Sequence, residues 1–290
     1  MTTIHERVLL VSFHCSRWGN RKRETEESRL IEGKHGSDHG VFSVSKSLMA
    51  SSALKEINAA YNRAKQTHNL LTSPWDLNGQ GIITTRGYTE YTRLMQENKM
   101  TFDGAAHTFC YENLDDLIKA EESRQGDSFN IDDYPTADEI FECFDFKVNV
   151  DELSRGDDIR VDVSDAERKA IANNINQRND ERIEAAVKTI FKRIAEVTEK
   201  MHEKLSEYKK KDSGGKGSGF HDSLVSNVLE LANILPELNI TNDPKITELH
   251  TQLTKDLCQN SAIMLKNRDD LRSDTARKAK KIYDKVSSYM

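Results

Sequence analysis

The chain has 290 residues, of which 36% are hydrophobic and 31% charged, with four prolines, four cysteines and a formal net charge of −6. An average globular domain is about 45–50% apolar and about 25% charged, so this composition favours long helices packed in few layers. No run approaches the roughly 20 apolar residues of a membrane span, no secretory leader pattern is present and no two cysteines are closely spaced, so we expect neither a membrane protein nor a secreted disulfide scaffold.

In the N-terminal half, the pattern of apolar residues predicts one strand and two helices. The apolar run at residues 7–13 predicts a strand. Residues 16–40, which contain several glycines, predict irregular backbone. Apolar spacing predicts helices over 45–71 and 88–123, and the stretch from 74 to 87 predicts a loop. Loops of this length are often functional.

The middle of the chain contains a predicted helix and a predicted β-hairpin. Thr136 followed by Glu139 is a capping box, in which the hydroxyl accepts a backbone N–H and the glutamate reaches back, so a short helix is expected to begin there. Residues 146–150 and 159–163 each alternate apolar and polar side chains, which predicts two paired strands.

The C-terminal half contains the clearest periodicity. A second capping box at Ser164 predicts the start of a helix that runs to residue 210. Its apolar residues follow a nearly heptad spacing: Ile183, Val187, Ile190, Ile194, Val197, Met201, Leu205 and Tyr208. A helix with a single apolar stripe needs a partner helix. After a glycine-rich linker at 212–219, helices are predicted over 220–235 and from 244 onward.

These elements predict a mainly α fold: an elongated helical bundle with a long antiparallel coiled-coil-like hairpin. A small β element, the N-terminal strand plus the hairpin, completes it. We expect an N-terminal mixed domain over 1–163 and a helical hairpin or bundle over 164–290. Packing within the chain is the first interpretation of the apolar stripe. Self-association through 183–208 is the alternative.

Charge is unevenly distributed along the chain, which suggests two candidate binding surfaces. Residues 112–165 contain 18 acidic and 5 basic residues, whereas residues 264–290 contain 8 basic and 4 acidic residues. The candidates for binding a basic partner protein are Trp75, Asp76, Asp132, Asp133, Asp157 and Asp158. The candidates for an alternative function, nucleic-acid binding, are Arg272, Arg277, Lys278, Lys280, Lys281 and Lys285.

No motif predicts catalysis, a cofactor or a metal. Residues 214–218 contain glycines and a lysine but lack the spacing of a phosphate-binding loop. The Asp-Phe-Lys sequence at 145–147, with Asp132, Asp133 or Asp138 upstream, only weakly matches the two acids and a lysine of metal-dependent nucleases. The spacing of four further residues does not match that of a zinc finger: His14, Cys15, His35 and His39.

Several short sequences, in order along most of the chain, carry a resemblance to a known family. They are Val-Ser-Phe-His-Cys-Ser-Arg-Trp-Gly (11–19), Thr-Ser-Pro-Trp-Asp (72–76), Tyr-Thr-Glu-Tyr (88–91), Asp-Tyr-Pro (133–135), Phe-Lys-Val (146–148), Phe-His-Asp-Ser-Leu-Val (220–225) and Leu-Asn-Ile-Thr-Asn-Asp-Pro (238–244). Together they resemble family 3150 of domains of unknown function, which occurs in bacteriophages and mobile elements. That family has no established catalytic residues, so the resemblance assigns none to this chain.

The resemblance implies a genomic context, and the context suggests a function. Such proteins are encoded near a MoxR-type AAA+ ATPase and a von Willebrand A protein. We therefore expect a non-enzymatic phage or mobile-element protein that works in the host cytoplasm as a helical adaptor or regulator of such a complex. The alternatives are a nucleic-acid-binding accessory protein that uses the basic C-terminal helix, a structural component of the virion and an enzyme of a new type.

Overall fold

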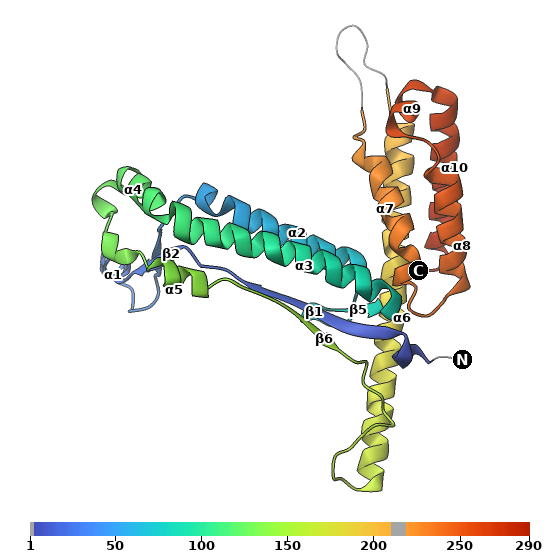
Figure 1. The fold of residues 1–290 in the computed structure, drawn as a ribbon, viewed down its shortest axis with the longest axis horizontal. Coiled ribbons are helices and arrows are strands. Elements are labelled where there is room, and N and C mark those ends of the chain that lie inside the picture. The colour runs from blue at the N-terminus through green and yellow to red at the C-terminus, as the bar shows by residue number, and fades with distance from the viewer. Residues whose placement is uncertain (1–2, 210–218) are drawn as a thin grey trace. The chain divides into compact units, whose positions relative to one another are not determined.

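The computed structural model describes residues 3–209 and 219–290, so the predicted linker, apart from Gly219, lies outside the described residues. The fold is mainly helical, with 66% helix, 11% strand and a small antiparallel sheet (Figure 1). The α-helices are α1 (Thr25–His35), α2 (Lys55–Leu71), α3 (Thr85–His107), α4 (Leu114–Gln125), α5 (Ala137–Glu142), α6 (Asp165–Ser206), α7 (Ser223–Leu238), α8 (Pro244–Gln252), α9 (Ala262–Asn267) and α10 (Asp269–Ser287). The strands are β1 (Val8–Ser16), β2 (Arg21–Glu24), β3 (Val44–Ser47), β4 (Ser73–Pro74), β5 (Gln80–Thr84) and β6 (Asp145–Asp151).

The chain divides into two compact units. The first unit comprises Met1–Ser12, His68–Thr92 and Asn149–Met290, and the second comprises Phe13–Thr67 and Arg93–Val148. Four elements, β1, α2, α3 and β6, contribute residues to both units. The predicted domain boundary between residues 163 and 164 falls inside the first unit, and it stays a prediction.

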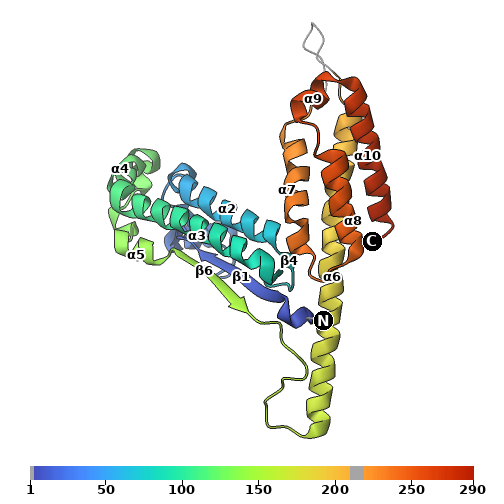
Figure 2. The ribbon, with the colours of Figure 1, turned by 45° about the vertical axis from the view of Figure 1, so that its right-hand side comes forward.

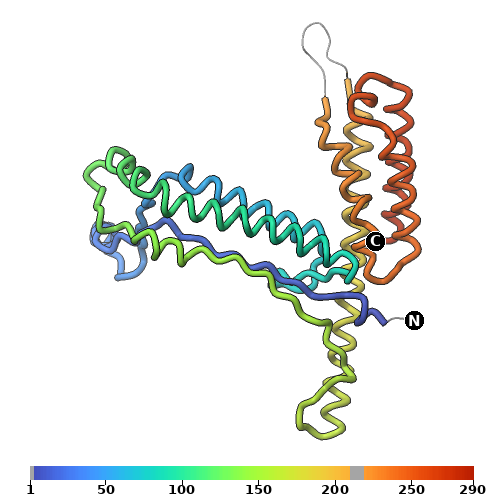
Figure 3. Tube along the Cα trace, viewed as in Figure 1, coloured from blue at the N-terminus to red at the C-terminus, as the bar shows by residue number. Residues whose placement is uncertain are grey.

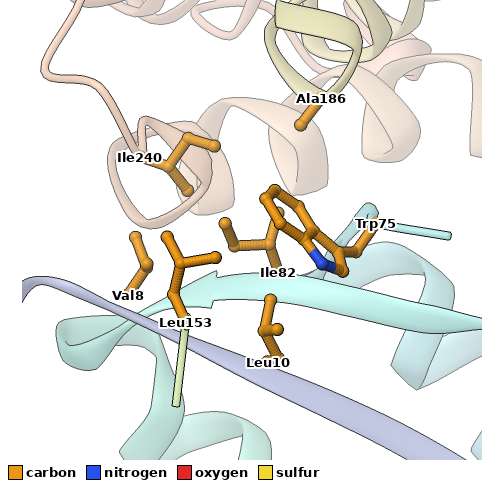
Figure 4. Close-up of a cluster of buried hydrophobic side chains, with 7 residues drawn as sticks. All are labelled: Val8, Leu10, Trp75, Ile82, Leu153, Ala186 and Ile240. Atoms are coloured by element: carbon orange, nitrogen blue, oxygen red, sulfur yellow. The ribbon is translucent and has the colours of Figure 1, made fainter. Parts of the chain in front are cut away.

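The core of the first unit lies where strands of the sheet meet the long helix α6. The sheet has the strand order β4-β5-β1-β6, and Val8–Ser12 of β1 pair antiparallel with Thr84–Gln80 of β5. Its buried cluster consists of Val8, Leu10, Trp75, Ile82, Leu153, Ala186 and Ile240 (Figure 4). The side chains come from β1, β5, α6 and the segments beside them, so strands and helices of this unit share one core.

The C-terminal helices of the first unit form an antiparallel bundle. Successive helices α6, α7, α8 and α10 run in alternating directions, with the short α9 before α10 (Figure 2). α10 packs along α6, and α7 packs against both α6 and α8. Short connections between antiparallel neighbours are typical of such bundles.

The buried face of α6 is wider than the predicted stripe. Ile190, Ile194, Met201 and Leu205 are buried as the spacing predicts. A second row of buried residues lies beside them: Ala186, Phe191, Ala195 and Thr198. A two-row face packs against several helices at once, so the long two-helix coiled coil is not confirmed. Self-association through 183–208 stays a prediction, but it would have to compete with this intramolecular packing.

The second unit has an aromatic core and a short β-ribbon. The ribbon pairs β2 with β3, from Arg21 opposite Ser47 to Glu24 opposite Val44. Phe13 of β1 lies 6.2 Å from Tyr61 of α2 and 4.9 Å from Phe146 of β6, between ring centroids. Further aromatic rings extend this core: Trp18, Phe102, Phe109 and Phe144. These contacts pack parts of α2 and α3 against β1 and β6 within this unit.

Several predicted elements are confirmed. β1 includes residues 8–13 of the strand expected over 7–13, and the capping boxes at Thr136 and Ser164 begin α5 and α6. Asp243 caps α8, which begins at Pro244. α2 lies within the helix predicted over 45–71, but the first residues of that range belong to β3, so the predicted start is wrong. Helices are also present within the range predicted at 88–123. This range is divided between α3 and α4 by a π-helical turn at Thr108–Asn113.

Other predictions are wrong. Residues 16–40 contain β2 and α1, which were missed because the exposed strand is Arg-Lys-Arg-Glu and the buried positions of α1 are the polar Ser28 and Glu32. Residues 159–163 form no strand, because β6 pairs with β1 instead. α7 continues through Pro236 to Leu238, since a proline in the last turn removes only one hydrogen bond from a helix that ends two residues later.

The predicted loop at 74–87 is also wrong, because these residues contain most of a hairpin of β4 and β5 and the start of α3. The glycine at position 81 favours a loop in the sequence pattern, although it lies within β5. A Cβ at Gly81 would lie 2.5 Å from the hydroxyl oxygen of Thr72, so this position of β5 has no room for a side chain.

Candidate functional site

Trp75, predicted to contact a partner, has a place in the core instead. Its side chain is 4% exposed and packs in the cluster of the first unit with Ile82 and Ala186 (Figure 4). The guanidinium of Arg182 lies 5.5 Å from the ring centroid. In this structure Trp75 therefore offers a partner almost no surface, and it anchors the β4–β5 hairpin to α6.

Asp76 shapes the turn of the same hairpin. Its Oδ1 accepts hydrogen bonds from the backbone N–H groups of Asn78 and Gln80, each at 2.9 Å. This is the local bonding by which aspartate stabilises tight turns. Leu77, at the tip of the turn, is fully exposed. The turn is thus structured by Asp76 and presents Leu77, which the sequence prediction did not name.

Asp132 and Asp133 have different environments in the second unit. Asp133 has a side chain that is 2% exposed, and its carboxylate accepts hydrogen bonds from Lys22 and Lys46. Burial raises the pKa of Asp133, but the two lysines outweigh that effect and hold the pKa below its usual value. Asp133 lines a groove of about 630 Å³ together with residues of β2, β3 and α4. It is an internal ion-pair partner, whereas Asp132 is exposed.

Asp157 and Asp158 are exposed on the acidic loop, by which we mean the segment 151–167, from the last residue of β6 to the first turn of α6. Asp157 forms an ion pair with Arg155 and Asp158 one with Arg160, both at 3.0 Å. These neighbours neutralise part of the local charge. The segment nevertheless contains seven acidic residues against two basic ones, so it stays strongly negative.

The acidic loop is attached to α6 by side chains of the helix. Asn179 donates its amide hydrogen to the carbonyl of Ser154 at 2.8 Å, and the backbone N–H of Gly156 donates to Oδ1 of Asn176 at 3.2 Å. A Cβ at Gly156 would lie 2.6 Å from the carbonyl oxygen of Ala172, so the loop requires glycine at this close approach. The loop and the first turns of α6 therefore form one structure (Figure 3).

We call this structure the arm, residues 154–182. Between residues 165 and 185 of α6 only Asn179 is buried, whereas eight residues are buried between 186 and 205. Most helices in proteins are stabilised by burying one face. The N-terminal half of α6 has little such burial among the described residues, and its surface is available to another molecule.

The six basic residues predicted to bind nucleic acid all line two grooves beside α10. The first groove, of about 410 Å³, lies between α10 and the C-terminal end of α6 and is lined by Arg272, Arg277 and Lys280. The second, of about 680 Å³, lies on the side of α8 and is lined by Arg277, Lys278, Lys281 and Lys285. The structure thus brings together residues that the sequence could only place on one helix.

Most of these cations also have acidic neighbours. Arg277 and Lys278 pair with Asp274, Lys280 pairs with Asp284, and Lys285 pairs with Glu248 of α8. Arg272 is mostly buried, pairs with Asp269 and lies over the ring of Tyr208. Lys281 forms no ion pair with a described residue. The exposed pairs among these contribute little stability, so the cations other than Arg272 remain available to a stronger anion.

The weak nuclease and zinc patterns are not assembled into sites. Among the described residues, no three His, Cys, Asp or Glu side chains are placed to hold a metal ion. Asp145 forms an ion pair with Lys147 at 2.6 Å, and Asp138 accepts a hydrogen bond from the Tyr111 hydroxyl at 2.9 Å. These residues therefore stabilise local structure.

All four cysteines are free, and burial makes most of them poor nucleophiles. Burial raises the pKa of the Cys15 thiol to about 11 and that of Cys110 to about 11. Burial also raises the pKa of Cys258. Because the thiolate is the reactive form, these three residues lack the chemistry of a catalytic cysteine near neutral pH.

The arm is the functional candidate that sequence reasoning missed as a unit. The capping box at Ser164 and the charge of the acidic loop were visible in the sequence. What was not visible is that Asn176 and Asn179 bind the loop back onto the helix, because side chain to backbone contacts between distant residues leave no periodic signal. The sign of these contacts in the sequence is the pair of asparagines, Asn176 and Asn179, which are three residues apart and so share one face of the helix.

The comparisons with known proteins identify no relative: no family model, no curated protein and no solved structure matches the chain. In the part of the chain that the structure describes, no helix is both long enough and apolar enough to cross a membrane.

Proposed function

We propose that this protein is a non-enzymatic adaptor that binds a partner protein through its arm. The observation that carries the proposal is the nearly complete lack of burial in the first half of α6. A helical segment of this length gains little stability from propensity alone, and its exposed surface suits docking by a second molecule.

The charge of the arm indicates the chemistry of the partner. Within the arm, residues 154–167 include five acidic and two basic residues, whereas residues 168–182 include two acidic and four basic ones. The negative charge that complements a basic protein surface is therefore concentrated in the loop part of the arm. Val161 and Ile171 are 53% and 38% exposed on the same arm, so it also offers apolar contact area. Protein interfaces typically combine an apolar centre with a polar rim.

The resemblance to the phage family proposes a first partner to test. Its genomic context makes a MoxR-type AAA+ ATPase the first candidate, with a von Willebrand A protein in the same complex, in the cytoplasm of a host cell. Of the residues named from the sequence, Asp157 and Asp158 lie on the arm and are exposed. We therefore assign the partner contact to Asp157 and Asp158, whereas Trp75 and Asp133 stabilise the fold.

Reversing the charge of the arm tests this proposal. The double substitution Asp157→Lys and Asp158→Lys removes two carboxylates and releases Arg155 and Arg160, so we expect it to weaken binding to the purified MoxR-type ATPase at least about tenfold. Titration calorimetry measures the change. Raising the salt from about 100 to about 300 mM NaCl should weaken the parent complex as well.

The matched control reverses another pair of adjacent aspartates. Asp115 and Asp116 are exposed in the first turn of α4, and Asp116 pairs with Lys119. Substituting both with lysine gives the same change in net charge away from the arm, and binding should stay near that of the parent. Equal weakening by the two double variants would show that only net charge matters and would refute a contact at the arm.

A further inference from the structure

We infer that the two grooves beside α10 form a binding surface for the phosphate backbone of a nucleic acid duplex. Six cations line the two grooves, and Glu248 and Asp256 are the carboxylates among the lining residues. Asp269, Asp274 and Asp284 lie beside the grooves and pair with four of the cations, so the six cations still exceed the five neighbouring carboxylates. Both grooves lie within the first unit and share Arg277. This inference does not depend on the proposed adaptor function.

The spacing of the cations favours a linear polyanion over a single phosphate. From Arg272 to Lys285 the helix extends about 20 Å, at 1.5 Å per residue. A DNA strand carries one phosphate for about every 3.4 Å of duplex axis, so a run of this length faces several phosphates. Arg277, Lys281 and Lys285 lie one helical turn apart and line the same groove, as a backbone contact requires.

The residues that line the two grooves also favour binding of a duplex, without recognition of its base sequence. Single-stranded nucleic acids usually bind through exposed aromatic rings on which bases stack. Of the aromatic residues beside α10, Tyr208 lies under Arg272 and Tyr283 under Lys280, with the cation 4.6 Å and 4.9 Å from the ring centroid. With those ring faces covered by cations, the surface offers charge and hydroxyl groups, including those of Ser206 and Ser273.

The test is fluorescence anisotropy with a labelled random-sequence DNA duplex of about 20 base pairs. With about four net phosphate contacts, affinity should fall roughly 100-fold between about 50 and about 200 mM salt. Arg277→Glu with Lys281→Glu should weaken binding by more than tenfold at the lower salt, and the neutral pair Arg277→Gln with Lys281→Gln should weaken it by less. The neutral pair avoids new repulsion with Asp274 and keeps the test valid if the charge-reversed protein folds poorly.

The control reverses Lys188 and Lys192, which are also one turn apart and exposed on α6. Binding by this control should match the parent. The inference is overturned if the parent shows no binding at the lower salt, or if the control weakens binding as much as the α10 variant. It is also overturned if a single strand of the same sequence binds as tightly as the duplex.

Discussion

Replacing Arg193 with methionine should lower the free energy of unfolding by about 3 kcal/mol, the largest loss we expect from any single polar side chain of this protein. Its guanidinium donates to the carbonyl oxygens of Asn69, Leu70 and Thr72 at 2.7, 3.1 and 2.8 Å. Two of these carbonyls belong to the last turn of α2, where carbonyls lack partners within the helix. Methionine fills similar space but leaves all three carbonyls without this donor.

Urea unfolding followed by far-ultraviolet circular dichroism measures this loss. Arg193→Lys should lose less free energy of unfolding than Arg193→Met, because an ammonium keeps the charge. It should still lose some, because the ammonium cannot reproduce the fork of the guanidinium. Arg182→Met is the matched control on the same helix: it removes only a contact with the Trp75 ring and should cost below about 1 kcal/mol. If the two methionine variants are equally stable, Arg193 does not have the role assigned to it.

Shortening the arm should abolish partner binding and leave the rest of the fold intact. We would remove residues 156–176 and join the ends with a short Gly-Ser linker. Asn179 donates to the carbonyl of Ser154 at 2.8 Å, so the two ends lie close together. Of the residues removed, only Gly156 is buried, and Leu153 stays in the core. Binding to the MoxR-type ATPase should therefore fall below detection in titration calorimetry.

Thermal unfolding of the same variant provides the control for its fold. A change in Tm of less than about 2 °C, roughly 1 kcal/mol for a chain of this length, would show that the arm is dispensable for stability. Undiminished binding by a folded variant would contradict the adaptor proposal. If the shortened chain unfolds, the double variant Asp157→Lys and Asp158→Lys tests partner binding independently.

Elements with their own local signal could be predicted from the sequence. β1 is an apolar run, and the starts of α5, α6 and α8 are set by capping residues that act within one turn. Half of the stripe on α6 was also correctly identified as buried, because Ile190, Ile194, Met201 and Leu205 recur at helical spacing. In these cases the physical cause lies within a few residues of its effect.

The remainder depends on contacts between distant segments. β2 contains no apolar residue and is stabilised by pairing with β3. The second buried row of α6 includes Ala195 and Thr198, which are small enough to allow close packing of neighbouring helices. Trp75 is one of the predicted partner contacts, yet it is buried against α6. Asp133 looked like part of an acidic surface until Lys22 and Lys46 were placed beside it.

The candidate binding surfaces also divide into features with a local signal in the sequence and features that depend on contacts between distant segments. The six cations could be placed on one C-terminal helix from the sequence, but the two grooves that they line depend on α6 and α8. Their binding of nucleic acid stays a prediction. The arm was missed because it is defined by lack of burial, and burial becomes known only when the helices of the bundle are in place.

Hydrogen–deuterium exchange, measured with and without the MoxR-type ATPase, tests the central claim most directly. In the free protein, amides of residues 157–178 should exchange faster than those of residues 186–205, because only the latter segment of α6 is buried in the bundle. Addition of the ATPase should slow exchange in the arm and leave α4 unchanged. Protection of α4 or α10 with no change in the arm would contradict the account.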